Sequence, residues 1–68
     1  MIITRNTANV LALCYFGLDP SEGVTGARWA GRKTTITHCI NYGAIEKDGR
    51  TLTAKGLAIL EEHARSNP

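Results

Sequence analysis

The spacing of apolar residues predicts an amphipathic helix near the start of the chain, from about Thr4 or Asn6 to Phe16. Threonine and asparagine side chains accept hydrogen bonds from the free N–H groups of a first helical turn, so these residues favour a start there. Gly17 suits the left-handed residue that commonly follows a helix, and the next segment, Leu18-Asp19-Pro20, cannot continue it.

Two sides of this first helix are apolar. Val10, Leu13 and Cys14 form one stripe, and a second stripe contains Leu11, Tyr15 and Leu18. A helix that is apolar on two sides is covered on both. In a short chain the second stripe is a candidate interface between two copies, so a homodimer through Leu11, Tyr15 and Leu18 is a hypothesis.

The middle of the chain predicts two further helices, a short one over about Val24–Ala30 and another over Lys33–Tyr42, separated near Gly31. Ile36 and Ile40 of the second lie one turn apart and should face the core. Its opposite face then shows uncharged or weakly basic hydrogen-bonding residues, where glutamate and lysine are better helix formers. This composition indicates a contact surface made of Thr34, Thr35, His38 and Asn41, with Thr37 and Tyr42 at its edges.

The pattern changes again after Gly43. Residues 44–47 and 50–53 are predicted as two short strands, joined by Asp48-Gly49, a pair that favours a tight type I′ turn. Ile45 and Leu52 would then pack on the core. Thr53 is the expected cap of a last helix that runs from Ala54 to about Ala64.

Length and composition favour a small binding protein. The 68 residues make one domain at most, with a small core, and 43% of them are hydrophobic. No apolar run approaches the roughly 20 residues that span a bilayer, and the N-terminus lacks the features of a signal peptide, so we expect a soluble cytoplasmic protein with no membrane partner.

Catalytic and metal-binding patterns do not stand out. The two cysteines, Cys14 and Cys39, lie in apolar patterns, and with His38 and His63 they lack the spacing of a zinc site. No serine–histidine–acid set, carboxylate pair or phosphate-binding loop is evident. We therefore expect no enzyme activity, no catalytic residues, no metal and no cofactor.

The charge distribution says more than the net charge of +2. None of the six acidic residues lies between Gly23 and Ile45, whereas that stretch contains Arg28, Arg32, Lys33 and His38. Such a stretch produces a positive potential that attracts polyanions. A merely solvated surface with chance clustering of bases is the alternative, and the sequence leaves it open.

The segment "INYGAIEKDGRTLTAKGLAILEEH" resembles the C-terminal half of winged helix-turn-helix domains, as in repressors of the multiple-antibiotic-resistance type. The matching positions are Gly43, Ile45, Asp48, Gly49, Leu52, Thr53, Lys55, Gly56, Leu57 and Leu60. The preceding "TGARWAGRKTTITHCI" would supply the helix-turn-helix. The resemblance implies one α+β, mostly α domain over residues 1–68, with a three-helix core, a short β-hairpin wing and a C-terminal helix.

The resemblance also implies a function in transcription regulation, as a small protein that binds double-stranded DNA. The third helix would enter the major groove, where Asn41 can pair with adenine and threonine methyls can touch thymine, while the wing holds the backbone. The predicted DNA-binding residues are Arg28, Arg32, Lys33, Thr34, Thr35, Thr37, His38, Asn41, Lys47 and Arg50. A winged-helix module that binds another protein, as an adaptor or a phage-type inhibitor of host machinery, is the alternative.

Overall fold

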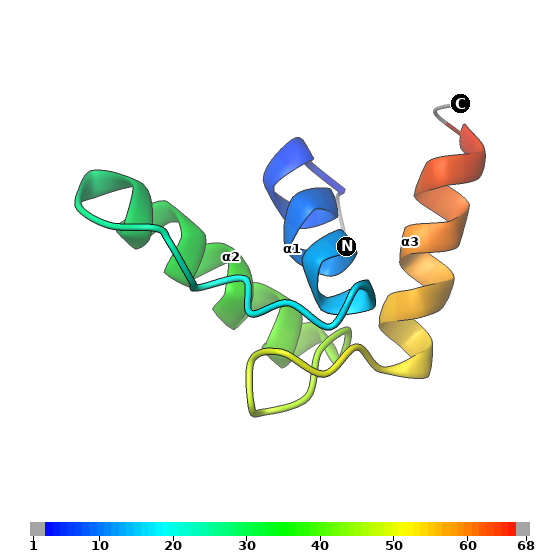
Figure 1. Ribbon diagram of the computed structural model, residues 1–68. Coiled ribbons are helices and arrows are strands. Elements are labelled where there is room, and N and C mark those ends of the chain that lie inside the picture. Colours follow the sequence, from blue (N-terminus) through cyan, green and yellow to red (C-terminus); the bar gives the residue numbers. More distant parts are fainter. Residues whose placement is uncertain (1–2, 67–68) are drawn as a thin grey trace.

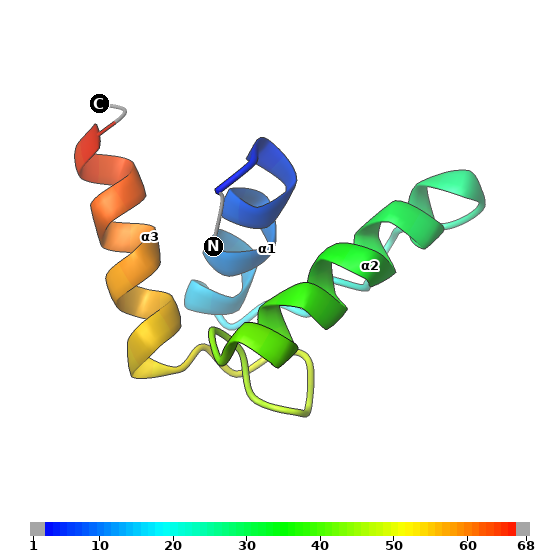
Figure 2. The ribbon, with the colours of Figure 1, turned by 180° about the vertical axis from the view of Figure 1, so that it is seen from behind.

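The computed structural model describes residues 3–66 and contains three helices. They are α1 (Arg5–Tyr15), α2 (Ala27–Tyr42) and α3 (Ala54–Ser66) (Figure 1). Helix α1 lies between the other two and packs against both. The arrangement leaves one long side of α2 and one long side of α3 without a neighbouring helix (Figure 2).

Helix α1 forms as its sequence predicts. The Thr4 hydroxyl caps it by accepting a hydrogen bond from the Thr7 backbone N–H at 3.2 Å. At the other end Gly17 has a φ of 77°, and the Leu18 N–H donates to the Leu13 carbonyl at 2.9 Å. This backward hydrogen bonding after a left-handed glycine is the usual way to satisfy the last carbonyls of a helix.

The core lies where α1, the second half of α2 and the following loop meet. Its buried members are Val10, Leu11, Cys14, Cys39, Ala44 and Ile45, surrounded by the partly buried Ile36, Ile40, Leu52, Ile59 and Leu60. From Ala27 to Thr35, α2 contributes no residue to this cluster. The first half of α2 therefore extends past the core, alongside the loop that precedes it (Figures 1 and 2), and Asn6 at the start of α1 borders the same hollow as Ala27 and Arg28.

The predicted helix-turn-helix is wrong, because the two helices expected over 24–30 and 33–42 are one continuous helix. Gly31 lies inside α2 with ordinary helical geometry and no neighbouring atom within 4 Å of an added Cβ. Glycine at such a site costs the helix only about 1 kcal/mol, which does not break it. Helix α2 begins directly after Gly26, whose φ of 66° cannot belong to a right-handed helix.

The predicted β-hairpin wing is also wrong, and with it the α+β winged-helix fold class. Residues 3–66 include no β-strand, and the loop over residues 43–53 has a single antiparallel bridge between Ile45 and Leu52. A type I′ turn needs positive φ at both central residues, but only Gly49 has it. Asp48 instead accepts the backbone N–H groups of Arg50 and Thr51, both at 2.9 Å, which takes donors away from a ladder.

Helix α3 begins where the sequence predicts and ends two residues later than expected, at Ser66. The Thr53 hydroxyl accepts from the Gly56 N–H at 3.0 Å and donates to the Gly43 carbonyl, so one side chain joins the cap of α3 to the end of α2. The Lys55 ammonium lies 4.1 Å from the centre of the Tyr42 ring. These contacts hold the loop and both helix ends together.

Candidate nucleic-acid interface

Helix α2 presents an exposed face that carries no carboxylate over its 16 residues. With 3.6 residues per turn, Thr34, His38 and Asn41 follow one another along a single line of the helix. All three are exposed, and the exposed Arg28 and Lys33 lie on the two flanks of this line. We call the line of Thr34, His38 and Asn41 the α2 row.

Threonine hydroxyls on this face are oriented by the helix itself. Thr34 donates to the Ala30 carbonyl and Thr35 donates to the Gly31 carbonyl, each at 3.0 Å. A hydroxyl whose proton is used in this way offers only its lone pairs to a ligand. In this arrangement the hydroxyl oxygens of Thr34 and Thr35 suit ligand groups that donate hydrogen bonds, such as the exocyclic amino groups of adenine and cytosine.

Beside the α2 row is an open hollow of about 700 Å³ between the start of α1 and α2. Its lining residues all have hydrogen-bonding side chains, and none is acidic: Thr4, Thr7, Thr34, Thr35, His38, Asn41 and Tyr42. We call it the threonine hollow. The structure thus brings together four predicted site residues and Tyr42, which was expected at the edge of this face. It adds Thr4 and Thr7, to which the sequence assigned no contact. Thr4 was recognised only as a cap, because no local pattern shows that α1 begins beside α2.

The two predicted arginines of α2 do not border the threonine hollow. Arg28 and Arg32 line a smaller hollow together with Asn6 and Val24. Arg32 donates through Nη1 to the Pro20 carbonyl at 2.9 Å, and Pro20 is fully buried. Arg32 therefore holds the 18–26 loop against α2, whereas Arg28 remains exposed at the flank of the α2 row.

Lys33, Thr37 and Lys47 surround a third hollow, which they share with Asp19 and Asp48. The Ser21 hydroxyl and N–H hydrogen bonds lower the pKa of Asp19. The Thr51 hydroxyl, with the N–H groups of Arg50 and Thr51, lowers the pKa of Asp48 to about 2. Both carboxyls are ionised at neutral pH, so they partly offset the positive charges of Lys33 and Lys47 on this side of α2.

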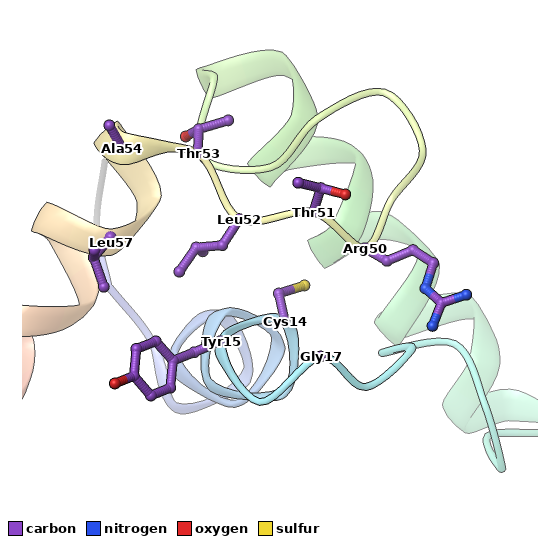
Figure 3. Close-up of a pocket in the computed structure, with 9 residues that line it drawn as sticks. All are labelled: Cys14, Tyr15, Gly17, Arg50, Thr51, Leu52, Thr53, Ala54 and Leu57. Carbon is purple, nitrogen blue, oxygen red and sulfur yellow. The ribbon is translucent and has the colours of Figure 1, made fainter.

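Arg50 lies away from the α2 row. It borders a fourth hollow, between the end of α1 and the start of α3, with Tyr15, Leu52 and Leu57 (Figure 3). The predicted homodimer interface lies here too, but Leu11 is fully buried inside the chain's own core and cannot contribute. Tyr15 and Leu18 are exposed, and so is Phe16, which sequence reasoning read only as the end of a helix.

Both cysteines are buried free thiols. Burial raises the pKa of the Cys14 thiol to about 11, and burial also raises the pKa of Cys39. Within residues 3–66 no three histidine, cysteine, aspartate or glutamate side chains gather in a way that could hold a metal ion. Over the same residues no helix is both long enough and apolar enough to cross a membrane.

Comparison with known proteins gives no family for the chain. No protein-family model matches it, and neither a curated protein nor a solved structure does.

Proposed function

We propose that this protein binds double-stranded DNA and that the exposed face of α2 enters the major groove. The observation that supports this most is the α2 row: three exposed hydrogen-bonding residues on a helix with no carboxylate, next to a hollow with no acidic lining residue. DNA is a polyanion, and a helix face without acidic residues meets no like-charge repulsion from phosphates.

The position of α2 suits this role. A major groove about 12 Å wide admits one α-helix, provided that its neighbours stand back. The first half of α2 extends past the core, and the one helix end that borders the α2 row is the start of α1, where Thr4 and Thr7 share the threonine hollow with it. Neither the rejected hairpin wing nor the rejected helix-turn-helix is needed for this helix to approach a duplex.

Individual contacts follow from side-chain chemistry. Asn41 can pair with the adenine edge, and the methyl group of Thr34 can contact the methyl group of thymine. Arg28 and Lys33, on the flanks of the α2 row, would hold phosphates and so set affinity and orientation rather than sequence choice. Thr4, at the edge of the threonine hollow, places a further hydroxyl group where the backbone would pass.

Protein binding is the second candidate, and a different surface favours it. Tyr15, Phe16 and Leu18 are large apolar side chains that are more than half exposed at the end of α1. Contiguous exposed apolar residues often mark a protein interface. This surface lies at the opposite end of α1 from Thr4 and Thr7, so the two candidate functions are separable by mutation.

The test is fluorescence anisotropy of a labelled random duplex titrated with protein between about 50 mM and 200 mM salt. We expect salt-sensitive binding, and Arg28→Ala/Lys33→Ala should reduce the slope of log affinity against log salt by up to about 1.8, or about 0.9 for each lost phosphate contact. The matched control is Arg50→Ala/Arg65→Ala, which removes the same charge elsewhere. No binding at the lowest salt, or equal slopes for both double variants, would reject the proposal.

A further inference from the structure

One surface has no role in the proposed DNA binding. At the end of α1, Tyr15, Phe16 and Leu18 are 58%, 72% and 53% exposed. The Tyr15 and Phe16 rings contact each other edge to face, with centroids 5.2 Å apart. We call these three residues the apolar knob. The edge-to-face contact places the two aromatic rings side by side as one exposed apolar projection.

Next to the knob is a recess of about 520 Å³. Figure 3 shows it between the end of α1 and the segment from Arg50 to Leu57. Leu52 and Leu57 point into it from one wall, and the Cys14 thiol points into it from the other (Figure 3). Tyr15 belongs both to the knob and to the lining of the recess, so projection and recess adjoin.

From this adjacency we infer that a second copy of the chain covers the knob and the recess, as a two-fold symmetric dimer. A two-fold rotation that inserts the knob of one copy into the recess of the other also performs the reverse insertion, so one patch complements itself. Arg50 borders the recess and lies close enough to Asp19 of the same copy to act on it electrostatically, so this edge of the patch carries a balanced pair of charges and two copies meet there without net repulsion.

The surface area buried between the two copies indicates what class of dimer to expect. The exposed parts of the three knob side chains amount to roughly 350 Å² per chain, or about 700 Å² in the dimer before the recess and its rim are counted. With those included the interface reaches about 1,000 Å², near the lower bound for a specific contact. Contacts of this size are typical of weak or transient complexes, so we expect a dissociation constant in the micromolar range or weaker. It forms whether or not DNA is bound, so it stands independently of the proposed function.

Sedimentation equilibrium of the full chain, from low micromolar to millimolar concentration, tests the dimer. We expect a reversible monomer–dimer equilibrium, and Phe16→Ser should raise its dissociation constant by at least about 30-fold, as loss of a central aromatic anchor does. Since Phe16 is 72% exposed, the change leaves the core intact, which thermal melting checks. The matched control is Tyr42→Ser, which removes an exposed aromatic ring outside the knob and should leave the equilibrium unchanged. Because Tyr42 also contacts Lys55, thermal melting checks that this variant is folded at the concentrations used.

Two results would overturn the dimer. Wild-type protein that stays monomeric at millimolar concentration would mean that a different partner, or none, covers the knob. A dimer with the same dissociation constant in Phe16→Ser as in wild type would mean that the two copies meet through another surface.

Discussion

Replacement of Gly56 by alanine tests the contact between α3 and the 43–53 loop. Gly56 is buried in the first turn of α3, and an added Cβ would lie 2.0 Å from the Ala44 carbonyl oxygen and 2.8 Å from Leu52 Cδ1. Real Cβ contacts essentially never fall below 3.0 Å, so backbone atoms must separate by at least 1.0 Å. The Ala44 carbonyl cannot move freely, because it accepts the Thr53 N–H at 3.1 Å and Ala44 is fully buried.

The loss of folding free energy expected for Gly56→Ala follows from these contacts. Overpacking of a core site costs about 1–3 kcal/mol, and loss of the Thr53 to Ala44 hydrogen bond adds about 1 kcal/mol. Better helix propensity of alanine offsets up to about 1 kcal/mol. We expect a net loss of about 2–3 kcal/mol from a domain whose whole stability is about 3–10 kcal/mol. The melting temperature should fall by about 10–20 °C.

Thermal unfolding followed by circular dichroism measures the change, and Gly31→Ala is the matched control. Gly31 is exposed in the middle of α2, and nothing lies within 4 Å of an added Cβ. The same substitution there should raise the free energy of unfolding by about 0.5–1 kcal/mol. If Gly56→Ala melts at or above the wild-type temperature, the described packing of α3 on the loop is incorrect.

Three further predictions concern single side chains. The Asp48 carboxyl has its pKa lowered from 3.8 to about 2 in the folded protein, so it contributes stability above pH 3.8 that is lost as pH falls toward 2. The difference in melting temperature between wild type and Asp48→Asn should shrink over that range, and a constant difference would contradict the hydrogen bonds to Thr51. Thr53→Ala should cost about 1–2 kcal/mol in urea unfolding, because α3 loses its cap, whereas Thr53→Ser should restore most of it. With a pKa of about 11 instead of 9.0, the Cys14 thiol should react with a disulfide reagent at pH 8 about 100-fold more slowly than in denatured protein. Fast modification of the native thiol would show that α1 is less well packed than described.

Local signals predicted the helices at both ends of the chain well. Thr4 and Gly17 bound α1 because a cap and a left-handed glycine act on neighbouring residues only. Thr53 opens α3 for the same reason. Cys39, which lies in an apolar helical pattern, is buried in the core. Ile45 was expected in the core as part of a strand, and it is buried there although the strand does not form.

The wrong predictions arose where one short sequence can form two different local structures. The local pattern alone does not show which of the two structures forms. Gly26 and Gly31 are the same residue type, yet only Gly26 adopts a left-handed φ, and its position rather than its identity decides where α2 begins. The Asp48-Gly49 pair favours a hairpin turn, but the Asp48 carboxylate binds two backbone N–H groups and leaves one bridge where strands were expected.

The site was predicted in part. The row of Thr34, His38 and Asn41 follows from helix periodicity, so the sequence was enough to place these residues on one face. The bases were predicted only as a stretch of sequence, and the fold distributes them over different sides of α2 and the loop. Leu11 shows the same limit, since its apolar stripe is covered within the chain by elements distant in sequence.

The most direct test of the central claim is an NMR titration of isotope-labelled protein with a short DNA duplex at low salt. If α2 binds DNA, the amide signals of Thr34, His38 and Asn41 shift, with weaker or no shifts at Tyr15, Phe16 and Leu18. Shifts concentrated at the apolar knob, or none anywhere at saturating duplex, would contradict DNA binding by α2.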